Sequence, residues 1–521
     1  MTSPHNKPAV AFSRFLSDLA KYRPRLLLTV VVLMLLRSMT EGVSFVLLIP
    51  LLGLGSDAMK GAGDAGAGAG LAQGWLQSLL AGRLSLAGLL AVFLVVMLLR
   101  TLLGYAGAVA ASAYSSGLTH HIRSRIYTAL SRASWLHLAG SRQAEDTRAL
   151  TSQIECASTA TALTLNLASG SLTMLTGLGV ALLLSVPSTL AVVAAGAIMA
   201  VPMVVYQRRA YVRGIAAARA YQDLYDVLVA RMNGLKLAKA FAIERQLEDD
   251  FSSASDGLRK AEIAAQENGA RAALVQEAMA AALLGALVYA AIALFRIASL
   301  ELVVLIMIFA RLTPIGYGIQ SNLRSLAGLL PEYMLLRQRE AAAAAAAEGL
   351  SIAHRPISLR SALSVEAITF RHPGASGDAV LKQTTVAIQA GSAVGILGLS
   401  GAGKSTLADI MAGLIPPDSG RIVVDGVPID ASNRADWRAS VAYLPQDAPL
   451  FHDTLRANLL LGARRASDAD IWACLETVQA AGLVRSLPEG LETLAGDRGV
   501  RLSGGERQRL RLASALLRKP E

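Results

Sequence analysis

The chain has 521 residues, a formal net charge of +11 and 53% apolar residues, and its mean hydropathy is +0.46. This composition is too apolar for an ordinary soluble enzyme, and the length allows two or more domains. The positive charge suits either a nucleic-acid surface or loops that face an anionic membrane leaflet. Because long apolar runs accompany the charge, we favour the membrane and expect no nucleic-acid partner. Cys156 and Cys474 are the only cysteines, so no disulfide framework is expected.

Six segments carry the roughly 20 apolar residues that a helix needs to cross the hydrocarbon core. The first follows a basic N-terminal stretch and resembles a signal peptide, but it is too long and lacks a convincing cleavage site, so we interpret it as a retained helix. Together the segments predict an all-α, six-helix transmembrane domain over residues 1–335. In chain order they are Leu26–Leu52, Leu84–Tyr114, Ala157–Val186, Thr189–Tyr206, Ala272–Ile297 and Leu300–Leu330.

Charge predicts the orientation of these helices. Segment 118–160 carries five arginines and segment 207–271 carries eleven lysines or arginines, whereas the Gly- and Ala-rich loop 53–83 carries two basic residues. The positive-inside rule therefore places 118–160, 207–271 and both chain ends in the cytoplasm, with the protein in the cell membrane. Both basic segments show helical spacing, so we expect them to continue the membrane helices into water. Short tip helices at Leu136–Thr147 and Arg219–Val227 would contact the other domain; solvated loops are the alternative.

Ionisable and polar side chains inside the apolar segments are candidates for function, because they are costly in lipid. Two interpretations stay open: the residues line a polar substrate cavity, or they form an internal ion pair that holds the bundle together. The residues are Arg37, Glu41, Arg100, Arg311 and Gln320. After them, seven alanines from Ala341 to Ala347 predict a helical linker within 336–356, ending at Gly349.

From residue 357 onward the sequence has short strands separated by turns. The predicted strands are Leu363–Phe370, Val380–Ile388, Ser392–Leu397, Arg421–Val424 and Ser440–Leu444. Strands and helices alternate around a glycine-rich motif, which indicates an α/β nucleotide-binding domain over 357–521.

The motif runs from Gly398 to Thr406 and fits the phosphate-loop pattern at every fixed position. Glycines allow backbone N–H groups to turn inward, and the start of a helix adds positive potential for phosphate oxygens. Lys404 would reach the β- and γ-phosphates, and the Ser405 hydroxyl would bind Mg²⁺. The residues expected to hold ATP here are Gly398, Ser400, Gly401, Ala402, Gly403, Lys404, Ser405 and Thr406.

Three further features lie around the phosphate loop. Gln446 follows a predicted strand, where it could bind Mg²⁺ or hold the attacking water. In Leu502–Arg509, Ser503 can cap a helix while Gly504 and Gly505 expose backbone N–H groups as a second phosphate cradle; a plain capped helix is the alternative. His372 lies upstream of the phosphate loop, where a ring could stack on a base.

In this order, the phosphate loop, the Gln446 loop and the Leu-Ser-Gly-Gly motif at 502–505 resemble the ATP-binding cassette (ABC) transporters. Six spans ahead of the cassette resemble the exporter-type half-transporters, and Met232–Glu244 is similar to the second cytoplasmic segment of that group. The resemblance covers nearly the whole chain. It implies ATP-driven export of an unknown substrate across the bilayer, with ATP and Mg²⁺ as cofactors.

The resemblance also implies roles for single residues. Gln446 would sense Mg²⁺ and the γ-phosphate, and would act in catalysis with Lys404. Ser503, Gly504 and Gly505 would contact the γ-phosphate of ATP held by a partner chain, with Thr493–Gly499 as the cross-subunit loop. Two chains, most simply a homodimer, would enclose two ATP molecules.

The sequence departs from the family pattern in three ways. His372 stands where an aromatic residue is usual, and Ser514 replaces a common arginine. The third departure is that the chain stops at Glu521, before the Walker B strand with its aspartate and catalytic glutamate. We expect a fragment of a longer gene product, which makes the cassette C-terminally incomplete. The alternative is a membrane protein that binds nucleotide without hydrolysing it, and an in-frame Asp-Glu pair downstream would decide between them.

Overall fold

The computed structural model describes residues 8–53, 86–141, 143–184, 186–294, 299–349, 357–373, 378–446, 450–463, 465–496 and 502–520. Within it the chain divides into two compact units. One comprises Met1–Ser131 and Ser141–Ala342, and the other comprises Arg132–Gly140 and Ala343–Glu521. The predicted loop 53–83 and the 351–356 part of the predicted linker lie almost wholly outside the described residues.

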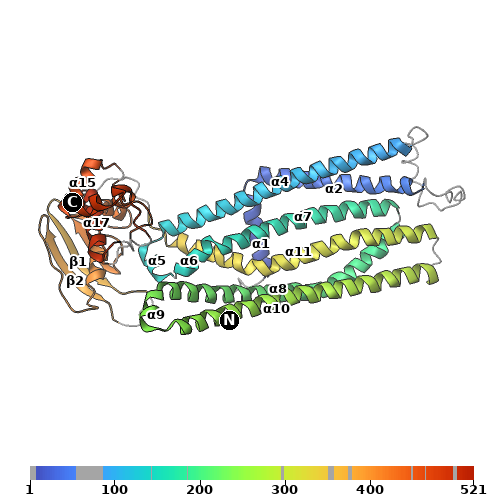
Figure 1. Cartoon of the computed structure of the whole chain (residues 1–521). Coiled ribbons are helices and arrows are strands. Elements are labelled where there is room, and N and C mark those ends of the chain that lie inside the picture. Colours follow the sequence, from blue (N-terminus) through green and yellow to red (C-terminus); the bar gives the residue numbers. More distant parts are fainter. Residues whose placement is uncertain are drawn as a thin grey trace. The chain divides into compact units, whose positions relative to one another are not determined.

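The first unit is a bundle of long helices (Figure 1). The predicted segments Leu26–Leu52, Thr189–Tyr206 and Leu300–Leu330 each lie within one helix, and the described residues of the other three predicted segments are also helical. The helices are α1 (Pro8–Lys21), α2 (Pro24–Gly53), α4 (Leu86–Arg132), α6 (Gln143–Leu150), α7 (Ser152–Leu184), α8 (Val186–Asn233), α9 (Leu235–Phe241), α10 (Glu244–Tyr289) with a π turn at Ala290–Leu294, and α11 (Ser299–Ala345).

Four helices among the described residues are long and apolar enough to cross a membrane. They occupy Leu90–Arg132, Glu145–Leu183, Val186–Asn233 and Glu244–Ala293. Helix α8 alone has 48 residues, which is roughly 70 Å at 1.5 Å per residue, more than twice the thickness of the hydrocarbon core at about 30 Å. The helices therefore continue well beyond a membrane, as predicted for 118–160 and 207–271. Six spans remain a prediction.

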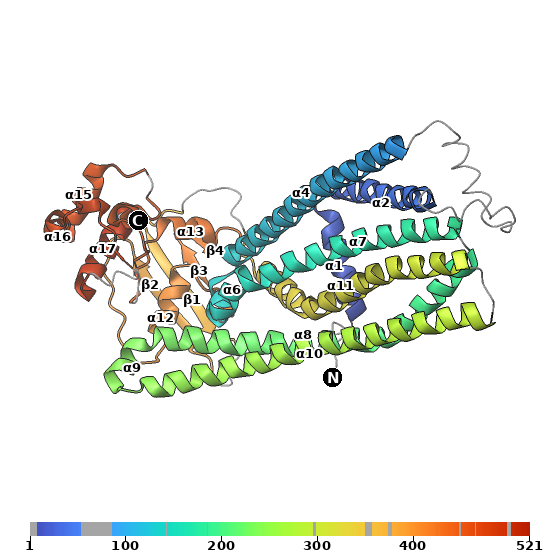
Figure 2. The same ribbon diagram turned by 45° about the vertical axis from the view of Figure 1, so that its right-hand side comes forward.

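Helices α8 and α10 lie side by side in both views, and the short helix α9 joins them (Figures 1 and 2). The tip helix predicted at Arg219–Val227 is wrong, because those residues lie inside α8. No proline or glycine occurs in α8 after Gly214, and Gly234 caps the start of α9. The second tip helix is therefore Leu235–Phe241.

Helix α1 has no counterpart among the predicted elements. Its residues Ala11, Phe15 and Leu19 are 0%, 1% and 5% exposed, and their spacing of four places them on one face. The Phe15 ring packs edge-on against Tyr333 of α11, with the ring centres 4.9 Å apart. The Tyr114 hydroxyl of α4 donates a hydrogen bond to the backbone oxygen of Leu19. These contacts bury α1 against the bundle, and the spacing of its apolar residues is the signal that predicts it.

Helices α8 and α11 approach each other closely at a point where both carry a glycine. A Cβ atom built on Gly214 would lie 2.2 Å from the backbone oxygen of Gly328. No real side chain tolerates that distance, so the absence of a Cβ at residue 214 permits the contact.

The second unit contains a four-stranded antiparallel sheet in the order β2-β1-β3-β4 (Figure 2). Its strands are β1 (Ala362–Phe370), β2 (Leu381–Gln389), β3 (Ser419–Val424) and β4 (Val427–Ile429). Helices α12 (Lys404–Met411) and α13 (Arg434–Ser440) supply Ile410 and Trp437 to the same core. Three of the five predicted strands are thereby confirmed.

The predicted strands Ser392–Leu397 and Ser440–Leu444 are wrong. Residues 392–397 and 441–444 form no strand, Ser440 ends α13, and Leu397 is 94% exposed. An extended segment becomes a strand only where a neighbour satisfies its N–H and C=O groups. Among the described residues no strand pairs with either segment.

The remaining helices form a second core in this unit. They are α14 (Leu455–Leu459), α15 (Asp468–Thr477), α16 (Ala481–Ser486), a 3-10 turn at Gly490–Glu492 and α17 (Gly504–Leu517). Helix α5 (Trp135–Gly140) also belongs to this unit. Its Leu136 packs on the sheet core, and the Ser134 N–H donates to the Ala346 oxygen at 2.9 Å. The first predicted tip helix, Leu136–Thr147, is therefore divided: residues 136–140 lie in α5 of the nucleotide-binding unit, and residues 143–147 lie in α6 of the bundle.

Replacing Gly214 by Ala should destabilise the bundle by about 1–3 kcal/mol, because the added methyl group must displace the α11 backbone. Gly196→Ala on the same helix is the control, since a Cβ there meets no atom within 4 Å. Thermal unfolding of the detergent-solubilised protein should show a lower midpoint for Gly214→Ala alone. Equal midpoints for the two variants would contradict the close approach.

Candidate nucleotide-binding site

The phosphate loop is a turn that leads into α12, as predicted. Gly401 and Gly403 have φ angles of +82° and +84°, a region that side chains other than glycine rarely adopt. Lys404 begins the helix, and its Nζ donates hydrogen bonds to the backbone oxygens of Gly398 and Leu399, at 2.9 and 2.8 Å. The lysine thus lies against the loop that it would help to close around phosphate.

The loop is anchored to the sheet through Gly403. A Cβ atom built there would lie 2.8 Å from Cγ1 of Val380 and 3.1 Å from Cδ2 of Leu381. Thr406 is buried below the loop, at 7% exposure, whereas Ser400, Gly401, Ala402 and Ser405 are exposed. The loop therefore has a packed base and an open outer surface, as phosphate binding requires.

His372 lies at the same end of the sheet as the phosphate loop. The Val380 N–H donates to the Phe370 oxygen at 2.8 Å, so the end of β1 adjoins the residues that touch Gly403. The His372 ring packs edge-on against Phe370, with the ring centres 5.1 Å apart, and remains exposed. The Arg371 N–H donates to Asp418 at 2.8 Å, which fixes the turn. An exposed ring held this way can receive a base.

Gln446 is exposed at the end of segment 441–446. Within that segment the Tyr443 hydroxyl donates to the Asp409 carboxylate of α12 at 2.6 Å. Burial and the nearby carboxylate raise the pKa of Tyr443 to about 12. The hydrogen bond ties the segment that carries Gln446 to the helix that Lys404 begins. Tyr443 is a positioning residue that the sequence did not reveal.

Ser503 caps α17, as predicted. The Glu506 N–H donates to Ser503 Oγ at 3.3 Å, and the Ser503 N–H donates to Glu506 Oε2 at 2.6 Å. These hydrogen bonds hold the pKa of the Glu506 carboxyl below its usual range. Ser503, Gly504 and Gly505 are all exposed. The first turn is thus locked in place with its glycines open to solvent.

The residue that replaces the family arginine has a structural contact. Ser514 is 7% exposed and donates to the Asn458 oxygen at 3.2 Å. The Asn458 amide in turn bonds the backbone of Phe451, accepting at 2.7 Å and donating at 3.0 Å. Ser514 therefore helps to fix the loop before α14. In the predicted cross-subunit loop, Leu494, which follows Thr493, forms an isolated antiparallel β-bridge with Thr454. Residues 497–499 of that loop lie outside the described part.

The described residues offer no cluster of three or more His, Cys, Asp or Glu side chains for a metal. Asp425, which directly follows β3, accepts hydrogen bonds from the backbone N–H groups of residues 360, 361 and 362 at 2.6 to 2.8 Å. These contacts lower the pKa of Asp425. Its carboxylate is therefore engaged in fixing the start of β1. The oxygen atoms of Ser405 and Gln446 are of the type that Mg²⁺ prefers, and both residues are exposed.

The polar residues of the bundle fall in different surroundings. A Cβ on Gly104 of α4 would lie 3.5 Å from Arg37 Nε, so Arg37 lies against α4, which also carries Arg100. The Glu41 side chain lies outside the described part. Arg311 is exposed on α11.

Gln320 belongs to a cluster that sequence reasoning missed. Its side-chain oxygen accepts from Gln276 of α10, and Arg324 donates to the other end of the Gln276 amide at 3.2 Å. Gln276 and Arg324 are 3% and 7% exposed. This cluster joins two helices of the bundle, which favours a packing role for Gln320.

Comparison with known proteins identifies both units. The family model "ABC transporter transmembrane region" matches residues 27–313, and the model "ABC transporter" matches residues 381–521. A structure described as a bacterial Atm1-family ABC exporter with ATP bound aligns with a TM-score of 0.75 and 21% identity, covering 96% of this chain and 84% of that one. It shows the shared fold.

Two relatives match about 30% of the chain. The ATP-dependent lipid A-core flippase of Ralstonia nicotianae is 41% identical over 160 residues, which are 30% of this chain and 27% of the relative. The mitochondrial iron-sulfur clusters transporter ATM1 of Kluyveromyces lactis is 40% identical over 139 residues, which are 27% of this chain and 19% of the relative. The matches therefore span between about a fifth and a quarter of these relatives' length.

Gly403→Ala should weaken nucleotide binding at least tenfold, because the added methyl group collides with Val380 and forces the loop off the sheet. Gly391→Ala is a matched control: its φ of +76° imposes similar backbone strain, but a Cβ there meets no atom within 4 Å. Titration with a fluorescent ATP analogue measures both affinities. An unchanged affinity of Gly403→Ala for the analogue would show that nucleotide binding does not depend on the contact between Gly403 and Val380.

Proposed function

The chain belongs to the ABC transporter family, and we propose that it is one half of an ATP-driven exporter whose nucleotide sites form between two such chains. The relatives named above are a flippase and a transporter, which supports export and gives no support to a protein that only binds ATP. The simplest partner is a second copy of the chain. We place the protein in the cell membrane, with six spans and both ends in the cytoplasm, because the basic residues concentrate in 118–160 and 207–271.

One observation carries the proposal: the two glycine turns of a single chain are both open. A Cβ on Gly401 or on Gly504 would meet no atom within 4 Å. In the described structure, the phosphate loop packs on the sheet core, and α17 packs on the helical core. Among the described residues, neither turn covers the other. A second chain that presents its Ser503 turn to the first chain's phosphate loop would enclose an ATP molecule.

The residues of this chain have distinct roles in that arrangement. Backbone N–H groups from Gly398 to Thr406, together with Lys404, bind the phosphates, and the His372 ring stacks on the base. Ser405 and Gln446 hold Mg²⁺, and Gln446 also orients the attacking water. Ser503, Gly504 and Gly505 contact the γ-phosphate from the partner. ATP supplies the free energy of its hydrolysis.

Movement of the nucleotide-binding unit would pass to the bundle through α5 and α6. Helix α5 belongs to the nucleotide-binding unit, and the next helix, α6, is tied to α11 by charged contacts. Arg148 forms an ion pair with Glu332, with 4% and 9% of the side chains exposed. Gln153 of α7 donates to the same carboxylate at 3.0 Å. A buried, paired network of this kind moves as a unit, so a shift of α6 would displace α11 and favour alternating access.

Lys404→Ala should lower the ATPase rate of the full-length gene product at least tenfold, since the ammonium group is the cation of the loop that faces the phosphates. The control is Lys382→Ala, which removes an exposed lysine that pairs with Asp378. Phosphate release in lipid nanodiscs measures both rates. A Lys404→Ala variant with the wild-type rate would refute the assigned role.

Ser503→Arg should abolish ATP-driven closure of the two nucleotide-binding units, because a bulky cation then occupies the turn that meets the partner's ATP. Ser467→Arg is the control. Ser467 caps α15 in the same way, with its own capping box to Asp470, so each change costs about 1 kcal/mol of capping. Energy transfer between fluorophores on the two units reports closure. If the Ser503→Arg units closed at the same ATP concentration as the wild-type units, the assignment of this turn to the partner's ATP would be contradicted.

A further inference from the structure

Helix α13 contacts the far ends of the two helices that begin at the glycine turns. Helix α12 begins with the phosphate loop, and the backbone oxygen of its last residue, Met411, accepts from the ring N–H of Trp437 at 2.7 Å. Helix α17 begins with the Ser503 turn, and Arg518, directly after its end, donates to the backbone oxygen of Arg438 at 3.1 Å. Both Trp437 and Arg438 belong to α13. This short helix is therefore the place where the supports of the two turns meet.

Gly413 brings α13 close to the end of α12. Its φ is +72°, which glycine adopts without strain. A Cβ atom built on Gly413 would lie 3.1 Å from Cγ of Arg434 and 3.2 Å from Cδ1 of Trp437. The Arg438 guanidinium donates to the Gly413 oxygen at 3.2 Å. Because the two elements are packed this closely, α13 must follow a displacement of the end of α12.

The same guanidinium holds the segment that follows α11. Arg438 forms an ion pair with Glu348, and their side chains are 28% and 20% exposed. Arg434, one turn earlier on α13, also interacts electrostatically with this carboxylate. The second carboxylate oxygen of Glu348 is buried and has no hydrogen-bond partner among the described residues. The charge of Glu348 therefore depends on these two cations of α13 for its compensation.

Glu348 is also part of a short β-bridge that holds α5. The Glu348 N–H donates to the Arg132 oxygen, and the Ser134 N–H donates to the Ala346 oxygen, each at 2.9 Å, within an isolated antiparallel bridge. Ser134 directly precedes α5. Two hydrogen bonds form a minimal ladder, and an isolated pair of strands is only marginally stable in water. The ion pair of Glu348 therefore fastens this bridge, and with it the start of α5, to α13.

Helix α5 has one further attachment in this unit, the packing of Leu136 on the sheet core. That contact is apolar and so has no preferred direction. It keeps α5 near the sheet, whereas the bridge sets the position of its first residue along the linker.

We propose that Arg438 and Glu348 are positioning residues that make α5 follow α12 and α17 when ATP closes the two nucleotide-binding units. This inference rests on the proposed function, and it assigns to one ion pair the coupling between nucleotide binding and movement of the bundle. The path runs along α12 and α17 to α13, from Arg438 to Glu348, and through the bridge to α5. All of these residues belong to the nucleotide-binding unit, and α6 of the bundle follows α5 in the chain.

The test separates closure of the nucleotide-binding units from movement of the bundle in Glu348→Gln, which keeps the shape of the side chain and removes its charge. The full-length gene product in lipid nanodiscs carries either fluorophores on the two nucleotide-binding units or a spin label at Leu183→Cys in each chain. Leu183 of α7 is 62% exposed, and Cys156 and Cys474 are replaced by serine. In wild type, ATP should close the units and change the distance between the two Leu183 positions. Glu348→Gln should close at the wild-type ATP concentration and lose most of the ATP-driven change in that distance.

A full change of the distance in Glu348→Gln would overturn the inference. Loss of closure in this variant would also overturn it, because the ion pair would then support the nucleotide site itself. A wild type that does not close with ATP would contradict the proposed function, and the inference with it.

Ser134→Pro is a second variant that tests the bridge independently. Proline has no N–H group, so this change removes the hydrogen bond to the Ala346 oxygen and leaves the ion pair of Glu348 in place. It should likewise close with ATP and lose most of the change in the Leu183 distance. A full change of the distance would show that the bridge does not carry the movement.

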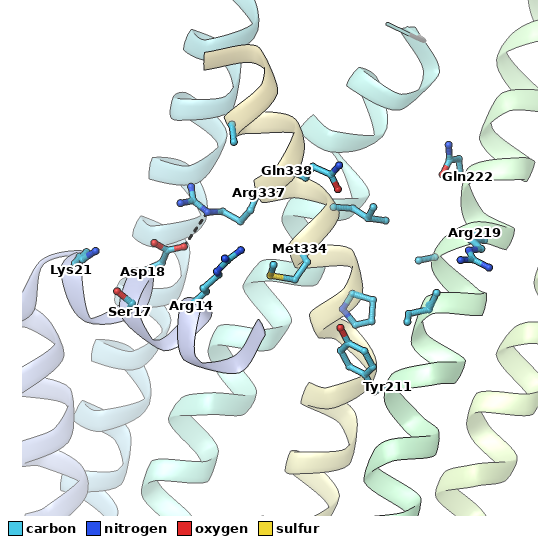
Figure 3. Close-up of a pocket in the computed structure, with 15 residues that line it drawn as sticks. Arg14, Ser17, Asp18, Lys21, Tyr211, Arg219, Gln222, Met334, Arg337 and Gln338 are labelled. Atoms are coloured by element: carbon cyan, nitrogen blue, oxygen red, sulfur yellow. Dashed lines mark ion pairs between the residues drawn. The ribbon is translucent and has the colours of Figure 1, made fainter. Parts of the chain in front are cut away.

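A matched control breaks an ion pair of similar exposure outside this path. Asp18 of α1 pairs with Arg337 of α11 at 3.2 Å, with 21% and 34% of the side chains exposed, beside a cavity of the bundle (Figure 3). Asp18→Asn should close and change the Leu183 distance as wild type does. The same loss of movement in this control would show that breaking any partly buried ion pair weakens the response, and would contradict the assignment to Glu348.

Discussion

The nucleotide site depends on the backbone of a single turn. Gly401 and Gly403 adopt left-handed conformations, and Gly403 packs so closely on Val380 that a side chain cannot fit. This contact fixes how closely the start of α12 lies to the sheet, and thereby the position of Lys404. The same end of the sheet carries His372, and Tyr443 fastens the Gln446 segment to α12. The residues of one chain that are proposed to contact ATP are therefore all held by the same end of the sheet and by α12.

The second turn has its own support. The capping box of Ser503 and Glu506 fixes the start of α17, while the rest of that helix is buried in a separate helical core. Two turns with positive local potential, each rigid and each open, are individually poor at enclosing a polyanion that water can still reach. When two chains bring unlike turns together, the phosphates receive N–H groups from both sides. The proposed dimer would complete each turn, and the chain belongs to the ABC transporter family.

Much of this arrangement is predictable from the sequence, because local rules dominate where it succeeds. The fixed glycine positions of the motif identify the phosphate loop, Ser503 predicts the cap of α17, and long apolar runs predict the helical bundle. Prediction fails where a distant partner decides the outcome. Residues 392–397 have the composition of a strand but no neighbouring strand in the described structure, and Arg219–Val227 simply continues α8. The Tyr443–Asp409 hydrogen bond and the Arg438–Glu348 ion pair join residues far apart in sequence, so no local pattern reveals them.

The most direct test of the central claim is a disulfide between the two turns. Leu399, which is 85% exposed, and Gly504 would be changed to cysteine in separately tagged chains, with Cys156 and Cys474 replaced by serine. The account predicts that ATP makes Leu399→Cys of one chain cross-link to Gly504→Cys of the other. A cross-link that forms only when both cysteines are in one chain, or that forms equally without ATP, would contradict it.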